Sequence, residues 1–248
     1  MKDNTKRFSD RVQDYIKYRP HYPEELIPFL KENIGLNESK IIADIGSGTG
    51  ISSIPFLKNR NKVFGVEPNK EMREAAEKLL SVYPNFKSID GSSEQTNLPA
   101  NSVDIVFAGQ AFHWFDKTES KTEFDRIVKK NGNIVLVWNS RSVHSQFLQD
   151  YEKVLYEIIE EYKLVNHRNI SDEEISQFFS PKKVNKATLE NQQILDLNGL
   201  KGRLLSSSYC PKSGPVYRKL MERIALLFNK HEKNGQIVFE YETQVYYG

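Results

Sequence analysis

Two carboxylates flank a glycine-rich bend near the start of the chain. The bend reads Asp44-Ile45-Gly46-Ser47-Gly48-Thr49-Gly50, and a second segment reads Gly65-Val66-Glu67-Pro68-Asn69. Glycines where a strand gives way to a helix let the chain turn sharply and let a ligand approach the backbone. Amides at the start of the following helix favour an anionic or polar group. The sequence therefore predicts a binding site for a small molecule at this bend.

The spacing of the glycines indicates the class of ligand. A dinucleotide-binding bend has glycines at relative positions one, three and six, but here they stand at one, three and five. Asp44 precedes the first glycine by two residues, where a carboxylate disfavours a pyrophosphate and favours an ammonium group. Glu67 ends the next apolar run and can accept both hydroxyls of a ribose. Together they describe a nucleoside joined to an amino acid, unless both acids only cap helices.

Short apolar runs alternate with amphipathic patterns before residue 140, and these elements must position the site. Runs at 41–45, 62–66, 86–89, 103–107 and 133–138 predict five buried parallel strands. Asn69 is the expected N-cap of a helix between two of them. Later residues favour long helices, with one continuous helical pattern over 147–162, and two further strands near 184–197 and 237–247. Alternating strands and helices predict an α/β fold with helices on both faces of a sheet.

Composition and charge limit the possible functions. The chain has 248 residues, of which 38% are hydrophobic and 27% charged, and its net charge is +2. Such a balance supplies no broad field for nucleic acid or anionic membrane. There is no run of about 20 apolar residues, as a membrane helix needs, and the first residues lack the apolar stretch of a secretory signal. Because Cys210 is the only cysteine, we expect a cytoplasmic protein without disulfides.

The motifs as a set resemble those of the class I S-adenosylmethionine-dependent methyltransferases. The matching segments are ADIGSGTG, GVEPNKEM, DGSSEQTNLPANSVDIVF and GQAFHWFD. FHWFD and YIKYRPHYP resemble more narrowly the small-molecule branch that includes trans-aconitate methyltransferase. The resemblance spans nearly the whole chain and implies S-adenosyl-L-methionine as cofactor and a small-molecule methyl acceptor as partner. It implies no nucleic-acid, membrane or metal partner, and a monomer or homodimer.

The same resemblance implies a Rossmann-like fold. We expect a seven-stranded, mostly parallel sheet with an antiparallel edge strand and an inserted helical lid. We expect a single methyltransferase domain, 1–248, in four parts. These are an N-terminal lid and helix (1–35), a cofactor-binding core (36–140), substrate-side helical insertions with a strand (141–235) and a C-terminal edge strand (236–248).

The resemblance also assigns residues to the cofactor. Its methionine part is expected against Asp44, Gly46, Ser47 and Gly48, its ribose against Glu67, and its adenine beside Pro68 or Asn69. Many relatives contact the adenine amino group with an Asp in the loop after the third strand.

This chain has Ser92 at the nearest place, followed by Ser93, whose backbone can make the contact instead. Gln110 follows the fourth strand, where relatives contact the cofactor near its sulfur. Relatives fold the N-terminal segment over the cofactor, so Arg19 is expected to pair with its carboxylate or, alternatively, to position the following helix.

His113 is the candidate general base, because its ordinary pKa near 6.5 suits proton removal near neutral pH. The alternative is that His113 and Trp114 pack the loop and shape the pocket. A carboxylate acceptor needs no base at all. Residues expected to touch the acceptor, against a solvated or packing role for each, are Tyr18, Tyr22, His113, Trp114, Arg141, Arg203 and Tyr209.

Three other functions fit parts of the pattern. An NAD-dependent oxidoreductase fits the glycine-rich bend, but the glycine spacing and Asp44 oppose it. A nucleic-acid or protein methyltransferase fits the motifs, but GQAFHW stands where base-modifying relatives have an Asn/Asp-Pro-Pro-aromatic motif. A non-catalytic module that binds S-adenosylmethionine fits them equally.

Overall fold

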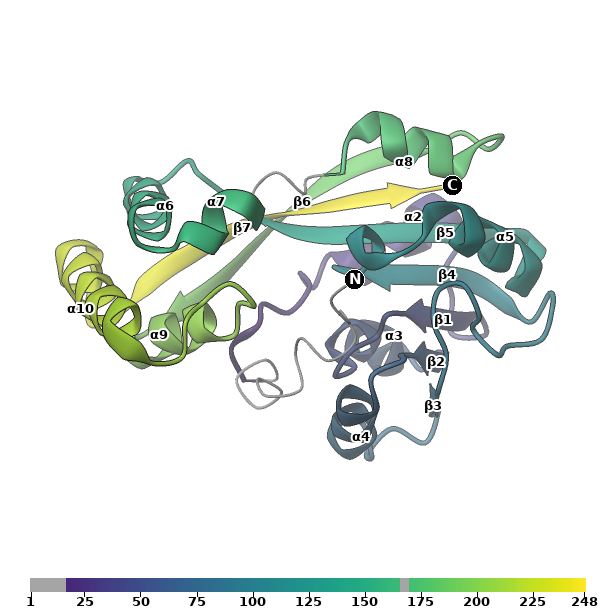
Figure 1. Ribbon diagram of the computed structural model, residues 1–248. Helices are drawn as coiled ribbons and strands as arrows, with labels where there is room; N and C mark the ends of the chain where they lie inside the picture. The colour runs from purple at the N-terminus through teal and green to yellow at the C-terminus, as the bar shows by residue number, and fades with distance from the viewer. Residues whose placement is uncertain (1–16, 166–169) are drawn as a thin grey trace.

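A seven-stranded sheet in the order β3-β2-β1-β4-β5-β7-β6 forms the centre of the molecule (Figure 1). The computed structural model describes residues 17–165 and 170–248. The first five strands are parallel, and β7 is antiparallel to both of its neighbours, β5 and β6. The strands are β1 (Ile41–Ile45), β2 (Lys62–Val66), β3 (Phe86–Ile89), β4 (Val103–Gly109), β5 (Val128–Arg141), β6 (Asn185–Leu195) and β7 (Ile237–Tyr247).

The predicted fold class is confirmed, with one difference at the antiparallel side. The C-terminal strand was expected at the edge, but β7 pairs on both sides and the edge strand is β6. Alternate residues of β7 are buried, whereas most side chains of β6 are exposed or half-buried. Polar residues suit an edge because they discourage pairing with another chain. The sequence pattern of the two strands thus fits the observed order.

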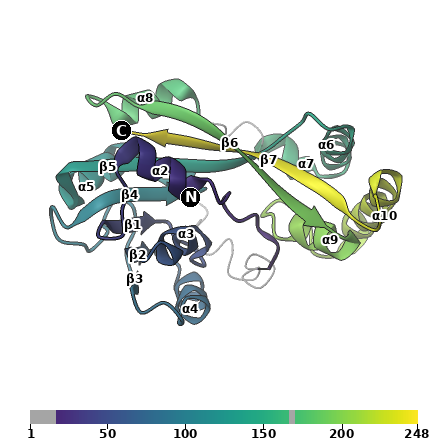
Figure 2. The same cartoon turned by 180° about the vertical axis from the view of Figure 1, so that it is seen from behind.

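Helices cover both faces of the sheet (Figures 1 and 2). On one face, α2 (Leu26–Ile34) and α3 (Ile54–Lys58) pack in a buried cluster with Ile42 of β1. On the other, α5 (Lys117–Ile127) and α8 (Asp172–Phe179) pack in a cluster with Ala43. Neighbouring strand residues point to opposite faces, which explains why Ile42 and Ala43 belong to different clusters. The predicted N-cap is confirmed, because the Asn69 side chain accepts from the Met72 amide at the start of α4 (Lys70–Leu79).

A group of helices lies beyond the carboxyl ends of β4 and β5 (Figure 1). It rests on the far ends of β6 and β7, which stay paired as far as Leu195 and Ile237 after β5 has ended at Arg141. A third buried cluster joins these strand ends to the helices. We call this unit the cap. Its helices are α6 (Gln146–Ile158), α7 (Glu160–Val165), α9 (Leu197–Leu205) and α10 (Gly214–His231).

One prediction about helices needs correction, and another is only partly covered by the described residues. The pattern over 147–162 predicted one helix, but α6 ends at Ile158 and α7 begins at Glu160. Both helices bury the predicted apolar residues, so a bend at Ile159 lets them follow the cap core. The first sixteen residues of the expected N-terminal lid lie outside the described residues. Within the described ranges, no helix has the length and apolar character to cross a membrane.

Residues 18–22, here called the strap, connect the cap to the core before α2. A Cβ atom on Gly202 of α9 would lie 2.3 Å from the Tyr18 ring, and one on Gly109 of β4 would lie 2.2 Å from the Tyr22 hydroxyl. Only glycine leaves room for such contacts. The strap therefore fits closely against both parts of the molecule.

Candidate functional site

A cavity of about 1080 Å³ lies between the carboxyl ends of the strands and the cap. Ligands of open α/β sheets bind at this edge, because the loops that follow parallel strands meet there. Most of the residues predicted for the site line the cavity: Arg19, Gly46, Gly48, Glu67, Pro68, Ser92, Ser93, Gln110, His113, Trp114, Arg141 and Tyr209. Arg203 lines it as well, whereas Asp44, Ser47, Tyr18 and Tyr22 do not.

The glycine loop has the backbone conformation that its sequence predicted. Gly46 and Gly48 have φ angles of 67° and 55°, in the left-handed region that favours glycine. A Cβ on Gly46 would lie 2.7 Å from the Ala111 Cβ, so the position cannot hold a side chain without a shift. The loop consequently presents bare backbone to the cavity.

Glu67 connects the glycine loop to the start of α4. One carboxylate oxygen accepts from the Gly48 amide at 3.0 Å and the other accepts from the Asn69 amide at 2.9 Å. Burial raises the pKa of the Glu67 carboxyl, and the two backbone amides act in the opposite direction. Each oxygen keeps a second lone pair in the cavity wall for a further donor.

Asp44 lies behind the loop. It is fully buried, and its Oδ2 accepts from the Ser52 and Ser53 hydroxyls at 2.6 Å each. Oδ1 is buried and accepts no hydrogen bond from the part of the chain that the structure describes. Burial raises the pKa of the Asp44 carboxyl to about 6, and the charge of Glu67 adds to this while the two hydroxyls oppose it. Asp44, which was predicted to lie against the methionine part of the cofactor, is thus buried next to the glycine loop and is not among the residues of the cavity wall.

Ser47 is also turned away from the cavity. Its amide donates to the Val66 carbonyl at 3.1 Å, and its side chain is buried against β2 near Gly65. This serine therefore helps to join the loop after β1 to the end of β2.

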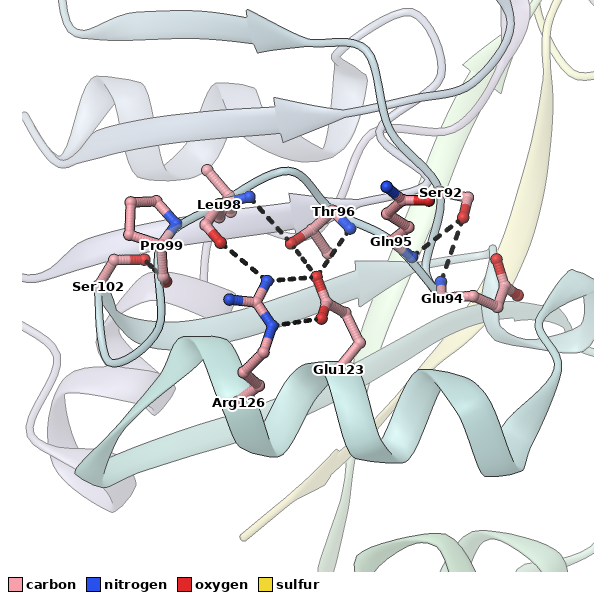
Figure 3. Close-up of polar contacts among 9 residues, drawn as sticks. All are labelled: Ser92, Glu94, Gln95, Thr96, Leu98, Pro99, Ser102, Glu123 and Arg126. Atoms are coloured by element: carbon pink, nitrogen blue, oxygen red, sulfur yellow. Dashed lines mark hydrogen bonds and ion pairs between the residues drawn. The ribbon is translucent and has the colours of Figure 1, made fainter.

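The loop after β3 is held by its own side chains and by α5 (Figure 3). The Ser92 hydroxyl accepts from the Glu94 and Gln95 amides at 3.3 and 3.2 Å. The Glu123 carboxylate of α5 accepts from the Thr96 amide at 2.8 Å, and it also accepts from Arg126 and the Thr96 hydroxyl. Ser92 thus stabilises a turn in the loop. It stands at the position where many relatives are expected to contact the adenine amino group with an Asp side chain.

The segment after β4 brings two aromatic side chains and a strained residue to the cavity. Gln110 has a φ of 60°, which is uncommon outside glycine, and its side-chain amide donates to the Asn139 carbonyl at 3.1 Å. Phe112 is buried among core aromatic residues, which turns His113 and Trp114 toward the cavity. The ring centres of His113 and Trp114 lie 4.6 Å apart.

Arg141, at the end of β5, is neutralised within the cap. Its guanidinium pairs with the Glu152 carboxylate of α6 and donates to the Tyr162 hydroxyl. It also lies over the Tyr151 and Tyr162 rings, at 5.1 and 5.8 Å from their centres. Arg141 therefore has a structural partner for its charge.

Arg203, in α9, has no carboxylate partner among the residues that the structure describes, although it is only 9% exposed. Its Nε donates to the Tyr241 hydroxyl at 2.9 Å and Nη1 donates to the Ser207 hydroxyl at 3.2 Å. Its carbon centre lies over the Phe239 and Tyr241 rings, at 5.8 and 5.7 Å. Arg203 is a buried cation among neutral groups in the cavity wall.

The strap contributes one side chain to the wall. The Arg19 guanidinium donates to the Ser206 carbonyl at 3.1 Å, next to the end of α9. Tyr18 packs on Gly202 and Tyr22 packs edge-on against Phe107. Tyr18 and Tyr22, which were predicted to touch the acceptor, thus pack against the cap and the core and are not among the residues of the cavity wall.

Residues 43–136, from β1 to β5, match a family model described as a methyltransferase domain. The chain is thus similar to a methyltransferase domain over these residues, and we call this segment the methyltransferase core. The cavity described above lies at the carboxyl ends of its strands, so the glycine loop and Glu67 belong to the methyltransferase core and Arg203 to the cap that follows it.

Relatives and solved structures agree with this assignment. An uncharacterized methyltransferase-like protein of Schizosaccharomyces pombe is 32% identical over 151 residues, which are 60% of this chain and 58% of that protein. The match thus spans less than two thirds of that relative. A candidate methyltransferase of Dictyostelium discoideum is 27% identical over 79% of this chain and 74% of its own length.

The fold is shared with a solved structure from Anaeromyxobacter dehalogenans, described as a candidate type II methyltransferase. The TM-score is 0.65 at 19% identity, and the match covers 93% of this chain and 95% of the other. The cap and the edge strands are therefore part of the shared fold, together with the methyltransferase core.

Sequence reasoning missed several residues of the wall. Trp138 and Asn139 lie near the carboxyl end of β5, and Glu152 and Ser207 come from the cap. Trp138 is the last residue of the predicted strand 133–138 and Asn139 follows it, so their place at its carboxyl end was a usable signal. Glu152 and Ser207 carried none, because only the packing of α6 and α9 brings them to the cavity.

Proposed function

We propose that this chain transfers the methyl group of S-adenosylmethionine to a small-molecule acceptor held between the methyltransferase core and the cap. The observation that supports the proposal is the Glu67 carboxylate, which bridges the glycine loop and α4 in the cavity wall. A carboxylate at this place can accept ribose hydroxyls through its remaining lone pairs.

The residues of the wall fit this cofactor. The buried Asp44 carboxylate beneath the loop offers a negative potential for the cofactor's cationic amino-acid end, and its Oδ1 has an acceptor position left. The bare backbone of Gly46 and Gly48 lets that end approach closely. Pro68, Ser92 and Ser93 line the wall where we expect the adenine, and Gln110 lines it where we expect the sulfur.

The place of the cavity supports a small acceptor. Its wall combines loops of the core with cap residues such as Arg141 and Tyr209, so an acceptor must fit between two parts of the same molecule. The narrower likeness to trans-aconitate methyltransferases, the cytoplasmic location and the monomeric or dimeric state stay predictions.

The chain's own residues act by orientation and exclusion of water. When bound, S-adenosylmethionine supplies a methyl group that is already activated by its positive sulfur. Trp114 and Trp138 shield the cavity, and holding two reactants in line can supply about 7–11 kcal/mol of the barrier. His113 lies in the wall and accepts a proton only if the acceptor must lose one.

Calorimetry tests the proposal. S-adenosylhomocysteine is expected to bind the wild type tightly and NAD to bind weakly or not at all. Glu67→Ala is expected to weaken S-adenosylhomocysteine binding about 100-fold, because it removes the ribose acceptor and leaves the Gly48 amide without its partner. Glu71→Ala, an exposed acid in the first turn of α4, is the matched control.

Two outcomes would contradict the proposal. Tight binding of NAD without binding of S-adenosylhomocysteine would favour an oxidoreductase. Tight binding of S-adenosylhomocysteine without methyl transfer to any member of a broad metabolite panel, followed with labelled cofactor, would favour a non-catalytic binding module.

A further inference from the structure

The two arginines on the cap side of the cavity differ in how their charges are balanced. Arg141 pairs with Glu152, whereas no aspartate or glutamate of residues 17–165 and 170–248 forms an ion pair with Arg203. Both guanidiniums belong to the cavity wall. Of these two arginines, Arg203 is therefore the one whose charge no carboxylate of the described residues balances.

The surroundings of Arg203 hold the guanidinium but do not neutralise it. The Tyr241 hydroxyl, which accepts from Nε, itself donates to the Gln193 side chain at 2.7 Å. The Phe239 and Tyr241 rings support one face of the group. Burial of a charge without a counter-ion is unfavourable. An anion that enters the cavity can therefore bind favourably by forming an ion pair with the Arg203 guanidinium.

The donors that remain on Arg203 suit a carboxylate. Nε and one Nη1 hydrogen are used, while Nη2 makes no hydrogen bond to any residue that the structure describes. The free end of a guanidinium can bind both oxygens of a carboxylate in parallel. Ser208 and Tyr209, which follow in the chain, line the same wall and offer further hydroxyl groups.

We propose that Arg203 is the anchor for a carboxylate of the methyl acceptor, so that this enzyme acts on acidic small molecules. The inference rests on the proposed function. The carboxylate of the cofactor's own amino-acid end is a second source of the same chemistry. We favour the acceptor, because α9 belongs to the cap, whereas the glycine loop follows β1 in the other part of the molecule that lines the cavity (Figures 1 and 2).

The chain carries its own reporter for the test. It has two tryptophans, Trp114 and Trp138, and both line the cavity, so quenching of tryptophan fluorescence reports a ligand there. The probes are benzoate, hexanoate and glutarate, each compared with its amide, in the presence of saturating S-adenosylhomocysteine. At least one carboxylate is expected to bind about tenfold or more tighter than its amide.

Variants assign this preference to Arg203. Arg203→Gln is expected to bring carboxylate and amide within about twofold of each other, and Arg203→Lys to retain part of the preference. Lys201→Gln removes one charge from the same helix at a residue outside the cavity wall, and it should behave as the wild type. S-adenosylhomocysteine affinity, measured by calorimetry, should be unchanged in all three variants.

Several results would overturn the inference. These are equal binding of carboxylate and amide to the wild type, no saturable quenching by any carboxylate at millimolar concentration, and a preference that survives in Arg203→Gln. Loss of S-adenosylhomocysteine binding in Arg203→Gln would assign the residue to the cofactor instead. If the wild type itself fails to bind S-adenosylhomocysteine, the proposed function fails, and the same titrations without it still test the anchor.

Discussion

The two sides of the cavity are built in different ways. The cofactor side consists of loops that directly follow β1, β2, β3 and β4, and much of its surface is backbone, as at Gly46 and Gly48. The cap side consists of side chains from β5, α6 and α9, such as Arg141, Glu152 and Arg203. Backbone groups of a short loop are placed by local conformation, whereas the cap side chains are placed only by packing.

This difference predicts that the two sides can be disabled separately. Glu67→Ala should lower the affinity for S-adenosylhomocysteine and leave the preference for carboxylates, while Arg203→Gln should do the reverse. A variant that lowers both would show that the two sides share one binding unit.

The largest expected effect concerns Asp44 on the cofactor side. Its pKa of about 6 in the folded protein lies above the ordinary 3.8, so the folded state binds more protons between these values and loses stability as the pH rises through them. Asp44→Asn keeps an acceptor for Ser52 and Ser53 without the charge. Relative to the wild type, its free energy of unfolding should rise by up to about 3 kcal/mol between about pH 4 and about pH 7.

Urea unfolding at the two pH values measures this difference. Asp125→Asn, on the exposed surface of α5, is the control and should keep the pH dependence of the wild type. A constant difference between Asp44→Asn and the wild type would show that burial does not perturb this carboxyl. If Asp44 also attracts the cofactor's ammonium, Asp44→Asn weakens S-adenosylhomocysteine binding about tenfold at neutral pH.

A smaller effect is expected where the strap joins the two sides. An alanine in the interior of a helix is normally more stabilising than a glycine. In α9, however, a Cβ on Gly202 would meet the Tyr18 ring at 2.3 Å, so Gly202→Ala should lower the free energy of unfolding by about 2 kcal/mol. In a Tyr18→Ala background the cost should vanish, and an equal cost in both backgrounds would refute the contact.

The smallest effect is expected at Ser92. Its hydroxyl accepts from two amides of its own loop, so Ser92→Ala should loosen a turn and lower S-adenosylhomocysteine affinity less than about fivefold. Calorimetry beside Glu67→Ala provides the scale. A loss as large as that of Glu67→Ala would mean that the hydroxyl contacts the cofactor directly.

Several features of the molecule were predictable because short-range physics decides them. Asn69 caps α4, as the sequence predicted, and Ser171 forms a reciprocal capping box with Glu174 at the start of α8. The apolar runs became strands, and glycines stand where the backbone enters the left-handed region. These features depend only on residues a few positions apart, so local sequence patterns are enough to predict them.

What only the tertiary structure decided depends on distant partners. The sequence placed Asp44 beside the ligand, but the hydroxyls of the next helical turn hold it behind the loop. It could not distinguish Arg141 from Arg203, because the distinction lies in whether Glu152 of another helix reaches the guanidinium. A charge is balanced by what packs against it across the fold, and no spacing along the chain encodes that contact.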